Sequence, residues 1–231
     1  MMQYNFHVYI HFSGNAFLLN KCVTSLLPKV RQFSTAENPI VILNNTNLNL
    51  SDWIMVPDGW VDLKPPTPLI WATAHNWLLT LAKQNGDPFA FSCHTDVEIM
   101  DGALEEIFAV YERVKDTKWY CIFANECLGM QNLDFFYDEN VWYDAFLFPM
   151  YYSDNHIARI AYLRGYKEEM YFSPLVLHNK SHTIRDDRIM QLRNNLGFPK
   201  AGEIYKTIWG GMPGQETNND PFANGLFSRN K

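Results

Sequence analysis

The sequence predicts an α/β fold with a mostly parallel central sheet flanked by helices. Strand-like apolar segments alternate with amphipathic, helix-like segments from residue 6 to residue 197. The first three segments, at 6–12, 16–30 and 38–45, read as strand, helix and strand, which is the order of a parallel unit with a right-handed crossover. A hydrophobic content of 47% in 231 residues supplies enough apolar material for a substantial core.

The first half of the chain shows its elements through local patterns. Segments rich in β-branched and aromatic residues predict strands, and apolar residues at helical spacing predict helices. The expected order is a strand at 6–12, a helix at 16–30, a strand at 38–45, a helix at 69–86 and a strand at 87–93. Turn signals in Pro-Asp-Gly-Trp and Lys-Pro-Pro-Thr-Pro predict a loop over 46–68.

The second half continues the alternation and ends in a tail. We expect a helix at 102–115, a strand at 118–130, a helix at 154–167 ended by Gly165, a strand at 169–180 and a helix at 185–197. Residues 198–231 are rich in Gly, Pro and Asn, which is typical of an irregular extension. The chain shows no internal repeat.

Charge, termini and cysteines narrow the class of protein. A net charge of -6 disfavours a protein that holds nucleic acid through its phosphates. The N-terminus has no signal-peptide pattern, and no apolar run approaches the roughly 20 residues of a membrane helix. Four cysteines without CxxC spacing in apolar surroundings indicate reduced core thiols rather than a zinc site or disulfides: Cys22, Cys93, Cys121 and Cys127. We expect a cytoplasmic protein without a transmembrane segment.

Polar residues gather where three of the expected strands end. These clusters are Ser13 to Asn15, Asn44 to Asn45, and His94 to Glu98. Ligands of open α/β sheets bind beyond the carboxyl ends of the strands, so we expect a site at this edge.

Two residues at strand ends are candidate metal ligands. Asp96 follows the buried run Phe-Ala-Phe-Ser-Cys, where its carboxylate either binds a divalent cation or caps the next helix. His178 ends a second apolar strand and is either a ligand or a structural hydrogen-bonding residue. Asp154 stands at the start of an amphipathic helix, where it serves as a helix cap or as a general base.

Six segments, in order over roughly residues 6–222, resemble the family-2-type inverting glycosyltransferases. They are VYIHFSGNAFLLNKCVTSLL, IVILNN, CHTDVEIMDGALEEIF, YYSDNHIARIAYLRGY, LHNKSHT and IWGGMPGQETNNDPF. The third is similar to the family's variant of the DxD motif, and the fourth to its Glu-Asp-x-Asp segment. No single motif is specific, but their order along the chain is.

The resemblance implies a GT-A fold and transfer of a sugar from a UDP-, dTDP- or GDP-linked donor. It assigns Asp96 and His178 as ligands of Mn²⁺ or Mg²⁺, and Asp154 as the catalytic base. The donor-binding candidates are Phe12, Ser13, Asn44, Asn76, His94, Asp96, Arg185 and Trp209. Arg185 would place charge on the phosphates, or else is a solvated surface residue.

This chain departs from the family pattern at several of these positions. His94 stands where the family has Asp or Asn, Asn44 replaces an acid, and Ser153 replaces the Glu before the base. The nucleotide and the donor sugar therefore stay open.

The resemblance also implies a division of the chain. A GT-A catalytic domain is expected over 1–197, with a nucleotide-sugar half at about 1–100 and an acceptor half at about 101–197. The extension at 198–231 is either an active-site lid that brings Trp209 onto the donor, or a packed tail with a buried Trp.

Three hypotheses about the function stay open, and each implies a different binding partner. A glycan or small-molecule acceptor fits the acidic charge better than nucleic acid does. The same fold acting on hydroxymethylated DNA bases would be marked by a basic patch at Lys180, Arg185, Arg188 and Arg193. A non-catalytic nucleotide-sugar binder, or a nucleotidyltransferase of related topology, would have no need of Asp154.

Overall fold

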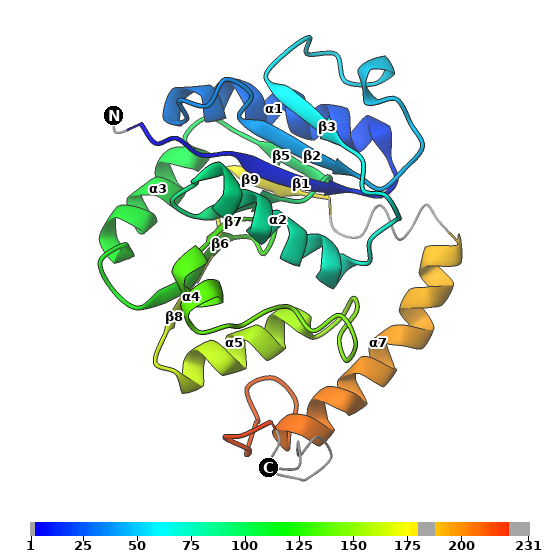
Figure 1. The fold of residues 1–231 in the computed structure, drawn as a ribbon, viewed down its shortest axis with the longest axis vertical. Coiled ribbons are helices and arrows are strands. Elements are labelled where there is room, and N and C mark those ends of the chain that lie inside the picture. The colour runs from blue at the N-terminus through cyan, green and yellow to red at the C-terminus, as the bar shows by residue number, and fades with distance from the viewer. Residues whose placement is uncertain (1–2, 180–187, 222–231) are drawn as a thin grey trace.

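The computed structural model describes residues 3–179 and 188–221 and shows an α/β domain of three layers (Figure 1). Its strands are β1 (Val8–Phe12), β2 (Ile40–Asn44), β3 (Trp60–Leu63), β4 (Ala90–Cys93), β5 (Val97–Ile99), β6 (Trp119–Ala124), β7 (Leu128–Gln131), β8 (Lys167–Tyr171) and β9 (Val176–His178). Its helices are α1 (Ala16–Phe33), α2 (Trp71–Asn85), α3 (Ala103–Val114), α4 (Leu133–Asp138), α5 (Ser153–Leu163) and α7 (Arg188–Trp209), with a short 3-10 turn at Leu50–Asp52.

The central sheet has seven strands in the order β3-β2-β1-β4-β7-β6-β8. All neighbouring pairs are parallel except those of β7, which runs antiparallel to both β4 and β6. A separate two-stranded ribbon joins β5 to β9. The mostly parallel sheet predicted from the sequence is confirmed.

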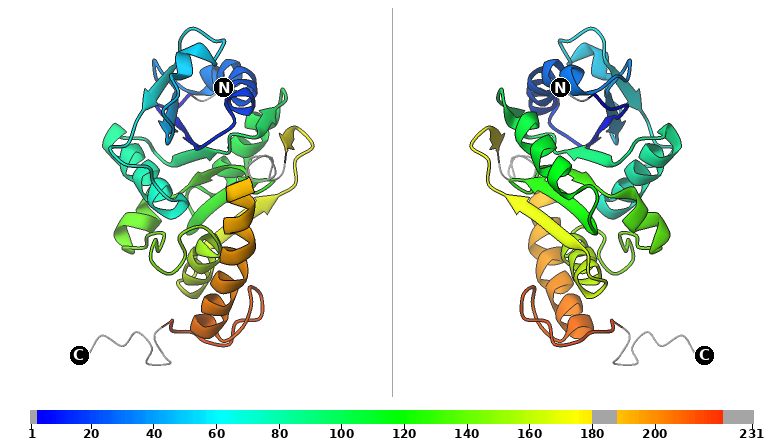
Figure 2. Two further views of the ribbon diagram at one scale, coloured as in Figure 1. Left: turned by 90° about the vertical axis from the view of Figure 1, so that its right-hand side faces the viewer. Right: turned by 90° about the vertical axis from the view of Figure 1, so that its left-hand side faces the viewer.

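Helices cover both faces of the sheet because successive strand residues point to opposite sides. One face carries Val8, Ile10 and Phe12 of β1 and packs against α1 and α3. The other carries Tyr9 of β1 and Leu43 of β2 and packs against α2, α4 and α5. The C-terminal helix α7 lies outside these layers and extends along one side of the domain (Figure 2).

Four expected elements differ from the structure. The loop predicted over 46–68 contains β3, which pairs in parallel with β2 at the sheet edge. The single strand expected at 118–130 is a hairpin, turned by Asn125 and Glu126 with φ of 52° and 60°. The strand expected at 169–180 is two strands in different sheets, β8 and β9. The helix expected at 185–197 is described from Arg188 and continues to Trp209, and residues 185–187 lie outside the described residues.

These differences share a physical cause. A strand acquires its partner from distant chain segments, so a short apolar run next to turn signals does not reveal whether it pairs. In the same way, an uninterrupted apolar run does not show where a two-residue turn divides it. Two short elements, β5 and α4, were not predicted from the sequence.

The cysteines follow the prediction: all four are buried and free. Cys22 Sγ lies 3.7 Å from Cys93 Sγ, where α1 packs on β4. Over the described part of the chain, no helix combines the length and the apolar character needed to cross a bilayer.

Candidate active site

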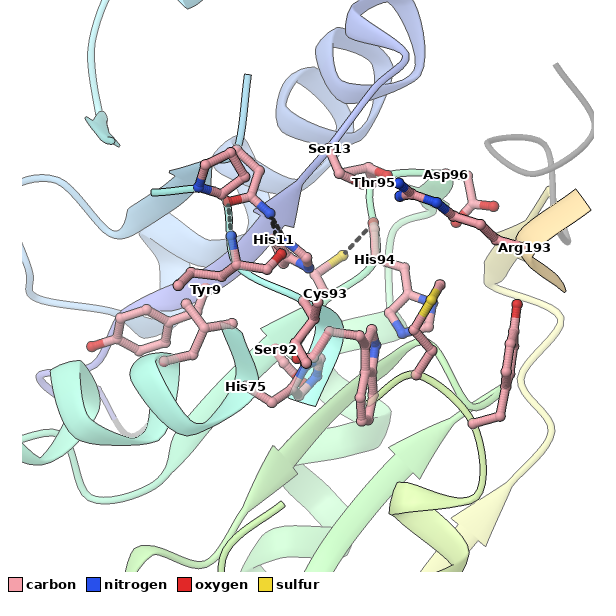
Figure 3. A pocket seen from close by; sticks show the side chains of 18 of the residues that line it. Tyr9, His11, Ser13, His75, Ser92, Cys93, His94, Thr95, Asp96 and Arg193 are labelled. Carbon is pink, nitrogen blue, oxygen red and sulfur yellow. Dashed lines mark hydrogen bonds between the residues drawn. The ribbon is translucent and has the colours of Figure 1, made fainter. Parts of the chain in front are cut away.

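A cavity of about 620 Å³ opens beyond the carboxyl ends of β1 and β4. Ser13, which follows β1, and His94 and Asp96, which follow β4, line its mouth (Figure 3). His178 lines it from β9. The cavity therefore lies at the edge where polar clusters end the strands, as expected for an open α/β sheet.

The β5–β9 ribbon brings Asp96 and His178 together. Val97, the residue after Asp96, pairs with His178 across the ribbon, and Asn179 N–H donates to the Asp96 carbonyl at 2.9 Å. This register leaves Asp96 Oδ1 3.3 Å from His178 Nε2. Backbone pairing, rather than a flexible side-chain contact, thus holds the two ligand candidates at one point.

His94 completes a cluster that could hold a metal ion. Each of His94, Asp96 and His178 offers one ligand atom, and these atoms lie within 4.8 Å of one another. Two atoms bound to one ion at about 2.1 Å and at angles of about 90–110° are about 3.0–3.4 Å apart, which matches the pair Asp96–His178. His178 Nδ1 is buried and has no hydrogen-bond partner among the described residues. The donor set therefore fits a divalent cation.

Electrostatics favour the deprotonated forms that bind a cation. Burial by itself raises the pKa of Asp96, but the hydrogen bond from His178 and the fields of His178 and His94 outweigh it and hold the pKa below its usual value. Burial, together with the field of His178, lowers the pKa of His94 to about 4. At neutral pH the site therefore presents a carboxylate and a neutral imidazole, which are metal ligands.

The inner cavity is lined by further neutral groups. Burial lowers the pKa of His11 to about 4 and that of His75 to about 3. Asn45 Nδ2 donates to His11 Nε2 at 2.8 Å, and His75 stacks on Trp71 with ring centroids 3.9 Å apart. These aromatic faces and amide groups could hold a planar, polar ligand such as a nucleobase.

Among the described residues that line the cavity, Arg193 is the one arginine or lysine. It reaches the mouth from α7, on the side of Thr95 and Asp96 (Figure 3). A guanidinium beside a bound cation would complement a diphosphate. The sequence predicts a role for Arg193 only as part of a basic patch that would bind DNA.

Four of the predicted site residues meet at this cavity: Ser13, His94, Asp96 and His178. Phe12 and Asn44 do not line it. Phe12 is fully buried against the α1 face. Asn44 uses its amide to donate to Leu48 O and Asp62 Oδ2 and to hold Thr46. Because side chains alternate along a strand, the neighbours His11 and Asn45 line the cavity instead.

Two other predicted donor-binding residues have structural partners. Asn76 exchanges hydrogen bonds with the Tyr143 backbone, donating to its carbonyl at 2.8 Å and accepting from its N–H at 2.9 Å. Trp209 is fully buried, and its indole N–H donates to His156 Nδ1 at 3.1 Å. A donor could contact Trp209 only if the end of α7 moved. Arg185 lies outside the described residues.

Asp154 is in the first turn of α5, three residues after Tyr151, which lines the cavity. Part of the residue is exposed to solvent, but burial of its carboxyl by the surrounding protein raises its pKa, and the negative charge of Glu126 adds to that effect. Glu126 belongs to the β6–β7 turn, so the start of α5 and this turn lie close enough for their carboxylates to interact. The turn itself is tied to the cluster, because His94 N–H donates to Cys127 O at 2.9 Å.

Five residues that line the cavity were not predicted as donor-binding residues from the sequence: His11, Asn45, Trp71, His75 and Arg193. Strict alternation along 6–12 would have placed His11 on the face opposite Phe12, so that signal was present. The others depend on how α2 and α7 dock, which no local pattern records.

The mostly parallel seven-stranded sheet between layers of helices is a GT-A fold. Neither a protein-family profile nor a curated protein sequence matches the chain. Among solved structures, TarS of S. aureus, a GT-A-like glycosyltransferase, is similar with a TM-score of 0.56 at 11% identity, covering 88% of this chain and 42% of TarS.

Shorter forms of TarS give the same result. TarS 1-349 has a TM-score of 0.54 at 11% identity, covering 72% of this chain and 58% of that one. Its complex with UDP has a TM-score of 0.50 at 11% identity, covering 73% and 60%. This chain thus spans about half the length of the TarS chains it matches, and at such identity the likeness shows the shared fold.

Proposed function

We propose that the protein is a metal-dependent, inverting glycosyltransferase that moves a sugar from a nucleotide-diphosphate donor to an acceptor hydroxyl. The observation that carries this proposal is the convergence of His94, Asp96 and His178 at the mouth of a cavity in a GT-A fold. The solved TarS fragment that shares the fold was obtained with UDP, which supports a nucleotide-linked donor.

Each group in the site has a defined part in this reaction. Asp96, His178 and His94 would hold a divalent cation, which supplies charge to offset the leaving diphosphate. Arg193 would contact the same phosphates. Neutral His11 and His75, with Asn45 and Trp71, would form the walls against the rest of the donor.

The transfer step needs one proton acceptor and no protein nucleophile. The acceptor oxygen bonds to the anomeric carbon while the bond from that carbon to the diphosphate oxygen breaks, and the hydroxyl proton passes to Asp154. A single displacement of this kind inverts the anomeric centre. NMR of the product's anomeric proton would show the inverted configuration, and retention would refute the single-step mechanism.

The first experiment is a screen of UDP-, dTDP- and GDP-sugars for release of the nucleoside diphosphate with Mn²⁺. We expect turnover with one nucleotide class, which EDTA abolishes. If no donor is bound or hydrolysed with any divalent metal, the proposal is wrong. If donors bind and none is turned over, the protein is a binder rather than an enzyme. If Asp154→Asn and wild type turn the donor over equally, another group is the base.

The DNA-modifying alternative has less support. Lys180 and Arg185 of the expected basic patch lie outside the described residues, and Arg193 lines the donor cavity. DNA binding that weakens steeply with salt would favour this alternative.

A further inference from the structure

A second groove, with a volume of about 830 Å³, is lined in part by His178. Its walls are the β6–β7 turn and the segment from β8 to β9. His178 lines both this groove and the donor cavity. One residue of the candidate metal cluster therefore also belongs to the wall of this groove, and nothing in the donor chemistry accounts for the groove.

The surface of this groove is mainly apolar. Met170, Phe172 and Leu177 are 48%, 83% and 48% exposed, although they are large hydrophobic side chains. The exposed Pro174 extends the same surface, and Val176 lines the groove from the core. Exposed apolar surface of this kind, next to polar groups, is typical of a binding site rather than of a solvated face.

The groove is also built rigidly. Asn125, held at a φ of 52° in the hairpin turn, donates from Nδ2 to Ser173 O at 2.8 Å and to Val176 O at 2.6 Å. Its Oδ1 accepts from Ser173 N–H at 2.8 Å. These three bonds fix the segment after β8 against the turn, so the groove exists before any ligand arrives.

The proposed base lies within electrostatic range of this groove. Glu126, which lines the groove, contributes to the raised pKa of Asp154, after the larger effect of burial. The groove thus has a polar part, which includes the Glu126 carboxylate and His178, and walls of apolar side chains. An acceptor whose hydroxyl lies at the polar part would place its remaining atoms along Phe172 and Leu177.

We propose that this groove binds the acceptor, and that the acceptor is an amphiphile with an apolar body adjoining the sugar or hydroxyl that is modified. This inference rests on the proposed transferase function and adds the class of acceptor to it. The apolar body is either an aliphatic chain, as in a lipid-linked sugar, or an aromatic aglycone. Both present the same chemistry to the groove.

Binding of three glucosides that differ only in their aglycone tests the proposal. Octyl β-D-glucoside below its micelle concentration, 4-nitrophenyl β-D-glucoside and methyl β-D-glucoside are titrated by calorimetry in the presence of Mn²⁺ and the nucleoside diphosphate. We expect octyl or nitrophenyl glucoside to bind at least about ten-fold tighter than the methyl compound. The tighter of the two identifies an aliphatic or an aromatic acceptor.

Matched variants locate the binding. Phe172→Ser and Leu177→Ser should lose the ten-fold advantage. Phe146→Ser, which removes a 90% exposed phenylalanine that does not line either pocket, should keep it. Circular dichroism and thermal melting establish that each variant is folded.

Several outcomes would overturn the acceptor proposal. Equal affinity for all three glucosides would show that the groove does not recognise an apolar body. An unchanged advantage in Phe172→Ser and Leu177→Ser would place binding elsewhere. A wild-type dimer by light scattering that both variants convert to monomer would make the groove an interface between copies. Donor hydrolysis is measured separately, so its presence or absence reports on the proposed function alone.

Discussion

His178 Nε2 lies 3.3 Å from Asp96 Oδ1: Asp96 immediately precedes β5, and His178 is the last residue of β9, the strand that pairs with β5. Backbone pairing of Val97 with His178 sets this distance. With His94 beside them, the site offers two imidazoles and one carboxylate. The relationship gives the cluster its chemistry and leads to the first prediction.

Mn²⁺ should bind more tightly than Mg²⁺, because imidazole suits transition metals whereas Mg²⁺ prefers oxygen ligands. Asp96→Asn and His178→Gln should each weaken Mn²⁺ binding at least about ten-fold. Calorimetry without any nucleotide measures this directly. Asp58→Asn, at a carboxylate 73% exposed, is the control and should bind as wild type does. Equal Mn²⁺ affinity in wild type and in all these variants would show that Asp96 and His178 do not form a metal site.

Asp154→Asn should lower the transfer rate by about 10²–10⁴-fold while the donor still binds. The rate should also fall on the acid side, because a protonated carboxyl accepts no proton. Since burial and then Glu126 raise the pKa of Asp154, this loss should begin at a higher pH than for an ordinary aspartate. A pH profile of kcat/KM would show this fall in rate as an acid limb. A profile without an acid limb would exclude Asp154 as the base.

Glu126→Gln offers a finer test of the same group. Removing the negative charge should lower the pKa of Asp154, so the acid limb of kcat/KM should move to lower pH. Glu105→Gln, on an exposed carboxylate of α3, is a charge-matched control and should leave the limb in place. A limb that stays fixed in Glu126→Gln would mean that another group titrates.

Arg193→Ala should raise the KM for the donor by about ten-fold, because a charge-assisted bond to a phosphate is lost. Lys200→Ala removes an exposed cation from the same helix and should have little effect. The affinity for the nucleoside monophosphate should change less than that for the diphosphate. If Arg193→Ala lowered the affinity for both ligands equally, or for neither, Arg193 would not contact the diphosphate.

Trp209→Ala should destabilise the fold by about 3–5 kcal/mol, because it leaves a cavity in the cluster with Phe148 and Tyr205. Urea unfolding measures the loss, and Trp53→Ala, at a half-exposed position, should cost far less. A lid role predicts the opposite pattern, with a large rise in donor KM and a small change in stability.

The sequence around Trp209 is compatible with both a mobile lid and a helix end. The sequence pairs this Trp with two glycines, which is typical of mobile loops as well as of helix ends. In the structure Gly210 takes a φ of 75° after α7, and the N–H groups of Thr217 and Asn218 donate to Trp209 O. The glycines therefore permit a tight return of the chain, a role that local sequence cannot separate from mobility.

The amino-acid pattern alone was enough to establish the α/β class and the sheet edge where the site lies. Hydrophobic periodicity reports which residues can be buried, and polar residues after apolar runs mark strand ends. That was enough for Asp96, His178, His94 and Ser13, all of which line the cavity.

The face of the sheet that holds the cavity, and the distant segments that reach it, became evident from the three-dimensional arrangement of the chain. Because side chains alternate along a strand, the cavity is lined by His11 and Asn45 rather than by Phe12 and Asn44. The docking of α2 and α7 adds His75 and Arg193 to its lining. Pairing partners and helix docking depend on contacts between segments far apart in the chain, and a local pattern carries no record of them.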